Sequence, residues 1–356
     1  MTAVTHWGRW PHSFGRRQAL PWPEQLLIIG PPGLGDTVTS LPALRQIRHE
    51  SPRTRVHWIA PSTFEPVLRL AGVDAFIALE SSPQPPLDLR IFGALLTLQD
   101  IDAATCAHLG ALAEITHRIG SANGLLQQKW CNHLVHVKRF GLPRHEAQRH
   151  FQLLMPFGVD VDLPLRALTQ RVGLPAPRLA VIADLPSAHY QVFHAFSHGH
   201  GREWPVAHWI ELARLLTGAG WQVVMTGSAA EGSRLADAWP ATARPTGMFD
   251  ACGRLDLAQL ASLLSRAAAV VAASTGPLHL AAALGVASVG LFAPRKGIDM
   301  SRWAPLGARA VGIQARARCA QRCDASTCRC IQKLLPQRVA DAVASAIASG
   351  TLDGCT

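Results

Sequence analysis

Short apolar runs alternate with amphipathic segments along most of the chain. In the first half, runs of strand length lie at 26–29, 56–60 and 75–79. Apolar residues at helical spacing over 37–50 and 65–71 separate these runs. In the second half, similar runs lie at 191–196, 223–226, 267–273 and 287–292, with helices expected at 206–218, 231–238, 257–266 and 336–349. Strand–helix alternation of this kind predicts parallel sheets covered by helices, so the expected fold class is α/β.

Two segments interrupt the alternation. We expect 92–157 to be mostly helical, and its six histidines lack tight metal-ligand spacing, so we assign them no chemistry. Proline and polar residues over 163–178 are typical of a linker between domains. With 356 residues, the chain is long enough for two cores. We therefore predict a flexible N-terminal extension over 1–23, a first domain over 24–165 and a second over 175–349.

The composition is that of a globular protein, with 48% hydrophobic and 16% charged residues. No run approaches the roughly 20 apolar residues of a membrane span. The N-terminus lacks the apolar core of a signal peptide, so we expect a cytoplasmic protein.

The formal net charge of +10 is concentrated between Arg295 and Arg338, where ten Lys or Arg residues face two Asp. This patch suits an anionic partner such as a membrane surface or a nucleotide, or is simply a solvated face. No nucleic-acid-binding signature accompanies it, so nucleic acid is not an expected partner.

The sequence STGPLHLAAALGVASVGLFAP, residues 274–294, has the pattern of a strand–turn–helix–strand joint. A small polar turn, Ser274–Thr275–Gly276, is followed by Pro277 at the expected first helical position. The free backbone N–H groups of such a helix N-terminus can hold a phosphate. An ordinary buried crossover has the same pattern, so the motif alone leaves both interpretations open.

Two further motifs carry candidate chemistry. Asp36 ends the glycine-rich turn 30–35 after the first strand, and it is either a general base or a helix N-cap. The spacing C-x3-C-x4-C-x-C is compact enough for four thiolates to surround one zinc or iron ion, although free or structural thiols are the alternative. Its ligands would be Cys319, Cys323, Cys328 and Cys330.

Four separated blocks together resemble glycosyltransferase family 9, the ADP-heptose:lipopolysaccharide heptosyltransferases. They are LLIIGPPGLGDTVTSLPALRQIR, GREWPVAHWIELARLLTGAGWQVVMTGSAAE, the 274–294 joint and the cysteine-bearing tail. In order and spacing they cover about residues 24–349. The resemblance implies a GT-B fold, in which two Rossmann-like domains face each other across a cleft. The first domain would bind the acceptor and the second the nucleotide-sugar.

The resemblance also implies an activity, the inverting transfer of heptose from ADP-heptose to a lipopolysaccharide core acceptor. Asp36 would be the general base, and Gly33 and Gly35 would let the acceptor approach the backbone. Arg202 would neutralise charge on the leaving group, and Glu231 would hold a ribose hydroxyl. The remaining donor contacts would come from Ser197, Ser274, Thr275, Gly276 and His279, the last of which is equally compatible with a structural role. No metal is required for catalysis if Arg202 and a helix terminus carry the charge.

Two departures from the family pattern bear on the substrate. Ser274 stands where the family usually has Asp, and Phe292-Ala293-Pro294-Arg295 replaces its FGPT turn. A second interpretation keeps the donor and makes the acceptor a hydroxyl of an autotransporter or other surface protein, as in a related group with cysteine-bound iron. A third is a catalytically silent relative that serves as a binding or targeting factor. The basic segment also suggests peripheral contact with an anionic inner membrane.

Overall fold

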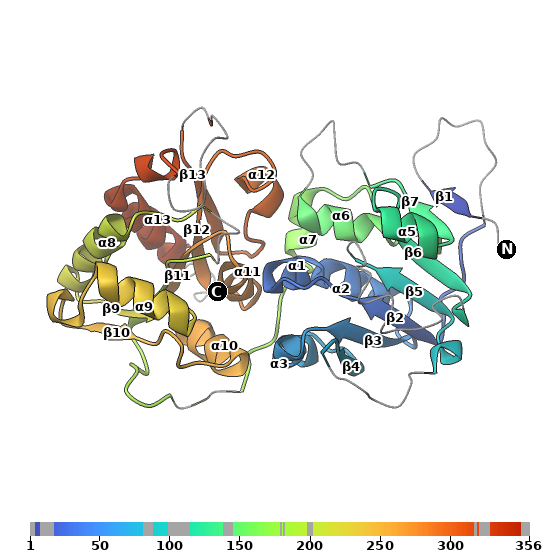
Figure 1. Cartoon of the computed structure of the whole chain (residues 1–356), viewed down its shortest axis with the longest axis horizontal. Coiled ribbons are helices and arrows are strands. Elements are labelled where there is room, and N and C mark those ends of the chain that lie inside the picture. The colour runs from blue at the N-terminus through green and yellow to red at the C-terminus, as the bar shows by residue number, and fades with distance from the viewer. Residues whose placement is uncertain are drawn as a thin grey trace. The chain divides into compact units, whose positions relative to one another are not determined.

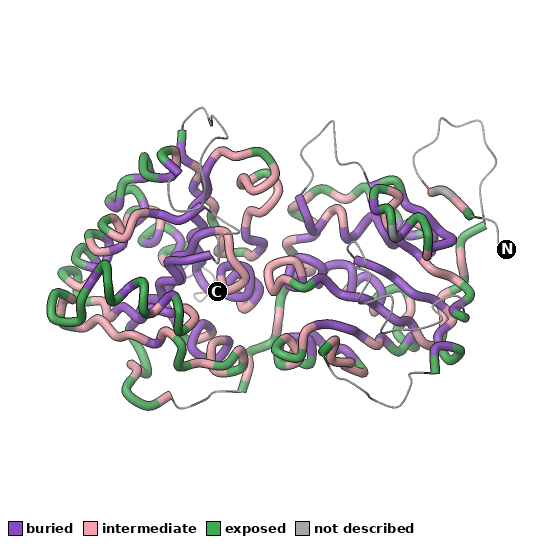
Figure 2. Tube along the Cα trace, viewed as in Figure 1, coloured by how far each residue is buried: buried purple, intermediate pink, exposed green. Residues whose placement is uncertain are grey.

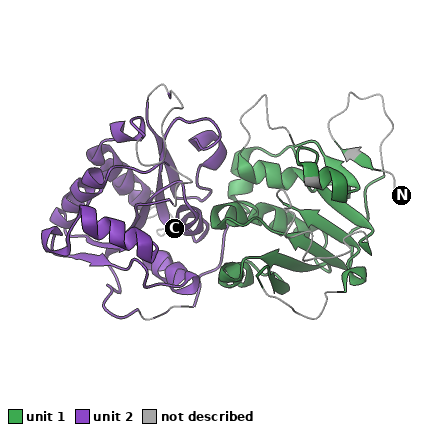
Figure 3. Cartoon of the chain, viewed as in Figure 1, with its two compact units in different colours: residues 1–172 green, residues 173–356 purple. Residues whose placement is uncertain are grey.

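The computed structural model describes residues 4–7, 18–80, 88–98, 114–137, 145–178, 180, 182–197, 202–316, 319 and 328–349. The chain divides into two compact units, residues 1–172 and 173–356 (Figure 3). Each unit is a parallel sheet with helices packed against it (Figure 1), which confirms the predicted α/β class. The division between the units falls inside the proline-rich stretch 163–178.

Unit 1 contains a seven-stranded sheet of order β1-β7-β6-β5-β2-β3-β4, in which every pair is parallel. Its strands are β1 (Thr5–Trp7), β2 (Gln25–Ile29), β3 (Arg55–Ala60), β4 (Ala75–Ala78), β5 (Ala94–Thr97), β6 (His117–Ser121) and β7 (His133–Val135). Its α-helices are α1 (Leu34–Thr39), α2 (Leu41–Glu50), α3 (Glu65–Leu70), α5 (Leu125–Trp130), α6 (Glu146–Gln152) and α7 (Leu165–Thr169). Short 3-10 turns lie at η1 (Ser62–Phe64), η2 (Leu89–Ile91) and η4 (Met155–Phe157).

Three expectations for unit 1 are wrong. The segment 92–157 is not mostly helical, because β5, β6 and β7 run through it. Part of the predicted flexible extension forms β1, which pairs with β7. The single helix expected over 37–50 is two helices that meet at Ser40. Pro42 explains this break, since proline lacks an N–H and clashes with the carbonyl four residues earlier.

Unit 2 contains a six-stranded parallel sheet of order β10-β9-β8-β11-β12-β13. Its strands are β8 (Tyr190–His194), β9 (Gln222–Thr226), β10 (Met248–Asp250), β11 (Ala269–Ala273), β12 (Ala287–Phe292) and β13 (Ala310–Gln314). Its helices are α8 (Val206–Gly218), α9 (Ala229–Ala238), α10 (Leu257–Arg266), α11 (Gly276–Ala283), α12 (Met300–Trp303) and α13 (Pro336–Ala348), with 3-10 turns η5 (Ala241–Ala243) and η6 (Ile331–Lys333). Four strands and four helices expected here are confirmed, with small shifts of their limits, whereas the described residues of 179–183, expected as a strand or the approach to one, form no strand.

The core of unit 2 lies where α8 and α13 pack on the sheet. Trp204, Trp209 and Trp239 are buried there together with side chains of β9, β11 and β12. Figure 2 shows the central strands of both sheets as buried, as expected for parallel sheets covered on both faces. In the described part of the chain, no helix is both long and apolar enough to cross a bilayer.

Candidate functional site

Each sheet has a point at which the strand order reverses. In unit 1 the reversal lies at β2, which pairs with β3 on one side and β5 on the other. In unit 2 it lies at β8, between β9 and β11. Ligands of open parallel sheets bind outside the carboxyl ends of strands at such a point. The glycine turn follows β2, and the loops that carry the predicted donor residues follow β8, β9 and β11, so both sets occupy this position in their own unit.

The glycine turn of unit 1 leads directly into α1. Gly33 is the N-cap of α1, and Asp36 is the third helical residue. The alternative that Asp36 is the N-cap is therefore wrong, and no side chain caps this helix. A Cβ added to Gly33 would lie 2.8 Å from Asp36 Oδ2, so glycine at this position leaves room for the carboxylate. Gly35 lies in the first turn of α1, and its contact with an acceptor stays a prediction.

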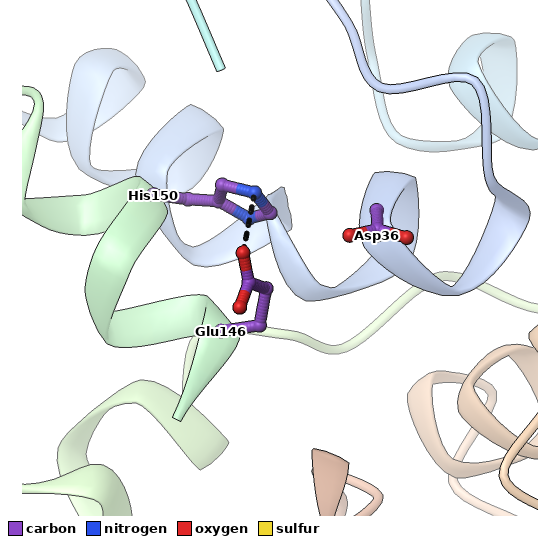
Figure 4. Close-up of side chains that lie close together, drawn as sticks. All are labelled: Asp36, Glu146 and His150. Carbon is purple, nitrogen blue, oxygen red and sulfur yellow. Dashed lines mark ion pairs between the residues drawn. The ribbon is translucent and has the colours of Figure 1, made fainter. Parts of the chain in front are cut away.

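Asp36 lies close to two side chains of α6, Glu146 and His150 (Figure 4). One carboxylate or imidazole atom of each residue lies within 4.8 Å of the other two. We call these three residues the α1–α6 cluster. Glu146 and His150 are four residues apart and thus share one face of the helix. Sequence reasoning missed the cluster because Asp36 is far from α6 in the chain and the histidines of this segment have no ligand-like spacing among themselves.

The charges of the α1–α6 cluster are partly compensated. Arg149 Nη1 lies 2.8 Å from Glu146 Oε2, and both side chains are largely buried. His150 Nε2 is 3.9 Å from Glu146 Oε1, too far for a hydrogen bond. Burial lowers the pKa of His150 to about 4, so its imidazole is neutral near pH 7. Because Arg149 already offsets the charge of Glu146, we assign no metal ion to this cluster.

In unit 2 the loop after β8 carries Ser197 and Arg202, which are both buried. Residues 198–201 between them lie outside the described residues. Glu203 ties the two ends of the loop together: its Oε1 accepts from the Ser197 N–H at 3.4 Å, and its Oε2 lies 2.7 Å from Arg234 Nη2 on α9. The Trp204 indole N–H donates to the Leu334 carbonyl at 2.9 Å. Contacts of Glu203 and Trp204 therefore hold the chain next to Arg202 in place, and one of them reaches Ser197.

Unit 2 also contains a cavity of about 240 Å³. Its lining combines the ends of β8 and β9 with the first turns of α9 and α10: His194, Thr226, Gly227, Ser228, Glu231, Ala251, Leu255, Asp256, Leu257 and Leu260. Glu231 has a structural task as well, because its Oε2 accepts from the Ser228 N–H at 2.8 Å and so closes the capping box of α9. Its predicted contact with a ribose hydroxyl stays a prediction.

The turn after β11 leads into α11 as the sequence predicts, except that Gly276, not Pro277, is the first helical residue. Thr275 is the N-cap, but its hydroxyl donates to the Ala273 carbonyl at 3.2 Å and no side chain caps the helix. Ser274, Thr275 and Gly276 are all half-buried. The backbone N–H groups of this turn are therefore in place for an anionic ligand.

His279 lies deeper in α11 and is 3% exposed. Its ring stands edge-on to Trp303, with the ring centroids 6.1 Å apart. This packing accounts for the residue structurally, and its contact with the donor stays a prediction.

The cysteine-rich segment is described only in part. Cys328 is buried in the core of unit 2, Cys330 packs against that core and Cys319 is half-buried, whereas Cys323 lies outside the described residues. Among the described residues, these three cysteines do not gather within 4.8 Å of one another. Zinc or iron at this segment stays a prediction.

The chain is similar to known proteins in sequence and in fold. The sequence profile of "Glycosyltransferase family 9 (heptosyltransferase)" matches residues 90–333. Lipopolysaccharide heptosyltransferase 1 of Pseudomonas aeruginosa is 29% identical over 294 residues, which are 76% of this chain and 79% of that protein. The structure of Escherichia coli ADP-heptose lipopolysaccharide heptosyltransferase II has a TM-score of 0.71 at 23% identity, covering 92% of this chain and 99% of the other. The iron-containing dodecameric glycosyltransferase TibC from enterotoxigenic E. coli has a TM-score of 0.58 at 14% identity, covering 93% and 78%. These structural similarities confirm the GT-B fold.

Proposed function

Because the chain belongs to glycosyltransferase family 9, we propose that it is an inverting heptosyltransferase that transfers heptose from ADP-heptose to a lipopolysaccharide core acceptor. The observation that carries the proposal is the position of Arg202, Glu231 and the Ser274–Gly276 turn. These residues come from the loop after β8, the first turn of α9 and the turn that begins α11, and these three segments follow adjacent strands beside the strand-order reversal of unit 2. The names of the relatives, which are lipopolysaccharide heptosyltransferases, support the choice of sugar and acceptor.

The donor would bind unit 2 in two parts. Leu255, Leu257 and Leu260 give the 240 Å³ cavity an apolar lining for the adenine ring of ADP-heptose. Glu231 also lines the cavity and would hold a ribose hydroxyl. The backbone N–H groups of Thr275 and Gly276 would hold the diphosphate. Arg202 offers the bidentate geometry that suits phosphate oxygens. Ser197 and Ser274 would add hydroxyl contacts.

In the reaction, the acceptor hydroxyl oxygen attacks the anomeric carbon of the heptose from the face opposite the diphosphate. The new carbon–oxygen bond forms while the bond to the diphosphate breaks, and ADP leaves with the electron pair, which inverts the configuration. Asp36 takes the proton of the acceptor hydroxyl as general base. Arg202 and the α11 N-terminus stabilise the charge that develops on the leaving group. No step in this scheme requires a metal ion.

The second acceptor to test is a hydroxyl of an autotransporter or other surface protein. A third hypothesis is that the chain is catalytically silent and only binds a partner. We also propose that transfer takes place on the cytoplasmic side of the inner membrane, with the basic segment 295–338 against anionic lipid. Sedimentation with anionic but not neutral vesicles tests that contact, and equal sedimentation with both would refute it.

ADP release tests the proposed function directly. The full chain is incubated with ADP-heptose and either heptose-deficient lipopolysaccharide or a candidate surface protein. We expect release with lipopolysaccharide, and a fall in kcat of about 100-fold or more in Asp36→Asn, with little change in the exposed control Asp237→Asn. ADP release with the surface protein but not with lipopolysaccharide would show that the acceptor is the protein. No release with either acceptor would refute the enzyme assignment, and an active Asp36→Asn would refute the base.

A further inference from the structure

The α1–α6 cluster places a second carboxylate beside the proposed base. Glu146 comes within 4.8 Å of Asp36, although the two residues belong to different helices. At this distance two carboxylates influence each other's proton affinity strongly, because each ionised group disfavours ionisation of the other. The reaction scheme above gives Glu146 no task, so its burial against the base needs its own explanation.

Glu146 is held firmly on its own helix. It is the first residue of α6, whose N-cap, His145, accepts from the Ala147 N–H through Nδ1 at 3.1 Å. Arg149 pairs with the Glu146 carboxylate at 2.8 Å, and the exposed fractions of the Arg149 and Glu146 side chains are only 14% and 8%. The carboxylate therefore keeps its place beside Asp36, and Arg149 moderates its field without removing it.

His150 occupies the remaining side of the cluster and contributes shape but no charge. It is 2% exposed, and its Nδ1 has no hydrogen-bond partner among the described residues. A neutral imidazole lies close to the carboxylates without compensating their charge. The charge that Asp36 experiences from α6 is thus set by Glu146 and Arg149.

Two charged groups on α2, the other helix packed against α1, have partners outside the cluster. On α2, Arg48 pairs with Asp74 at 2.6 Å and Glu50 accepts from Gln46 at 2.7 Å. The remaining titratable groups of α2 are Arg45 and His49. Neither His49 nor Glu50 joins the α1–α6 cluster within the described residues.

We propose that Glu146 is a positioning residue for glycosyl transfer: its carboxylate makes Asp36 a stronger base, and Arg149 sets how strong this effect is. The proposal rests on the proposed function, since it assumes that Asp36 accepts the proton of the acceptor. Glu146 itself touches no reacting atom. Its effect is measured as a change in the pH above which Asp36 can accept a proton, which is the position of the acidic limb in the pH profile of kcat/KM.

The test is the pH profile of kcat/KM between pH 5 and 9, measured by ADP release from ADP-heptose with heptose-deficient lipopolysaccharide and with EDTA present. Glu146→Gln removes the neighbouring charge, so we expect the acidic limb to move down by about one pH unit. Arg149→Gln uncovers the charge of Glu146 and moves the limb up. His150→Gln replaces a neutral group by a neutral group and leaves the limb in place. Glu146→Asp keeps the charge and restores most of the wild-type profile.

Opposite shifts in Glu146→Gln and Arg149→Gln would support the proposal, because a merely structural pair would lower the rate in both variants without moving the limb. If the acidic limb of the kcat/KM profile stays in place in both variants, or moves in the same direction in both, the proposal is overturned. If Glu146→Gln does not fold, Arg149→Gln and Glu146→Asp decide alone. An inactive Asp36→Asn together with unmoved limbs refutes only this proposal, whereas an active Asp36→Asn refutes the general base and this proposal with it.

Discussion

Gln191 on β8 is fully buried, and neither the nitrogen nor the oxygen of its side-chain amide has a hydrogen-bond partner among the described residues. Its neighbours across the sheet, Val223 and Ala269, are in register with it and belong to the apolar core under α8 and α13. Since residues in register on parallel strands face the same side, the amide of Gln191 lies against that core. Methionine has a similar length, is unbranched and carries no such polar group.

The expected gain follows from the cost of a buried polar group without a partner, which is about 1–3 kcal/mol. We therefore predict that Gln191→Met raises the free energy of unfolding of unit 2 by about 2 kcal/mol. For a unit of this size the gain corresponds to a rise in Tm of about 4–8 °C.

The neighbouring residue on the same strand provides a matched control. Tyr190 is also buried, but its hydroxyl donates to the Leu263 carbonyl at 2.7 Å. Tyr190→Phe removes a satisfied group, so it should lower the free energy of unfolding by about 1 kcal/mol. Urea unfolding followed by tryptophan fluorescence measures both variants. If Gln191→Met destabilises unit 2 as Tyr190→Phe does, the amide has a partner and the reasoning is refuted.

Three further predictions concern the candidate sites. Burial lowers the pKa of His150 from 6.5 to about 4, so the free energy of unfolding should fall by about 3 kcal/mol through this residue as the pH falls from 6.5 to 4. In urea unfolding at pH 7 and pH 4, the free energy of unfolding of His150→Gln should therefore change less with pH than that of the wild type. An equal change in both proteins would contradict the burial argument. Gly33→Ala places a Cβ 2.8 Å from Asp36 Oδ2, so kcat should fall about tenfold or more while the Kd for ADP stays unchanged, with Gly218→Ala on α8, whose Cβ meets nothing within 4 Å, as the control. If the cysteine-rich segment binds zinc or iron, metal analysis of the purified protein should find about one ion per chain, and Cys323→Ser should lose it; a metal-free wild type would rule the site out.

The sequence predicts the strands of unit 2 better than those of unit 1, for a physical reason. Buried parallel strands such as β11 and β12 are continuous apolar runs, so their limits can be read from composition alone. β6 instead begins with His117 and Arg118, which find partners in Ile115, Trp130 and His133. Such polar residues become acceptable in a strand only through tertiary contacts, and these contacts are not visible in a local window.

Two other differences between the expected and the observed elements of unit 1 were not equally predictable from the sequence. Pro42 was visible inside the helix expected over 37–50, and its clash with the preceding turn was enough to predict the break at Ser40. β1 had no such signal. Its three residues become a strand only because Thr5 pairs with His133, far away in the chain, and no property of Thr5–Trp7 alone specifies that partner.

The same distinction between local and distant information separates the candidate residues of unit 1 from those of unit 2. The donor-side residues follow strand ends, so recognising the strands was enough to bring Arg202, Glu231 and Thr275 to one edge of one sheet. The role of Asp36 required more, because its position relative to the strand fits either an N-cap or a base. The N-cap at Gly33 removes the first alternative, and Glu146 comes close to Asp36 only in the folded chain. Both facts depend on how α1 starts and on α6 packing beside it, so the surroundings of Asp36 required the folded chain, whereas the candidate residues of unit 2 were identified from the strand pattern together with the family resemblance.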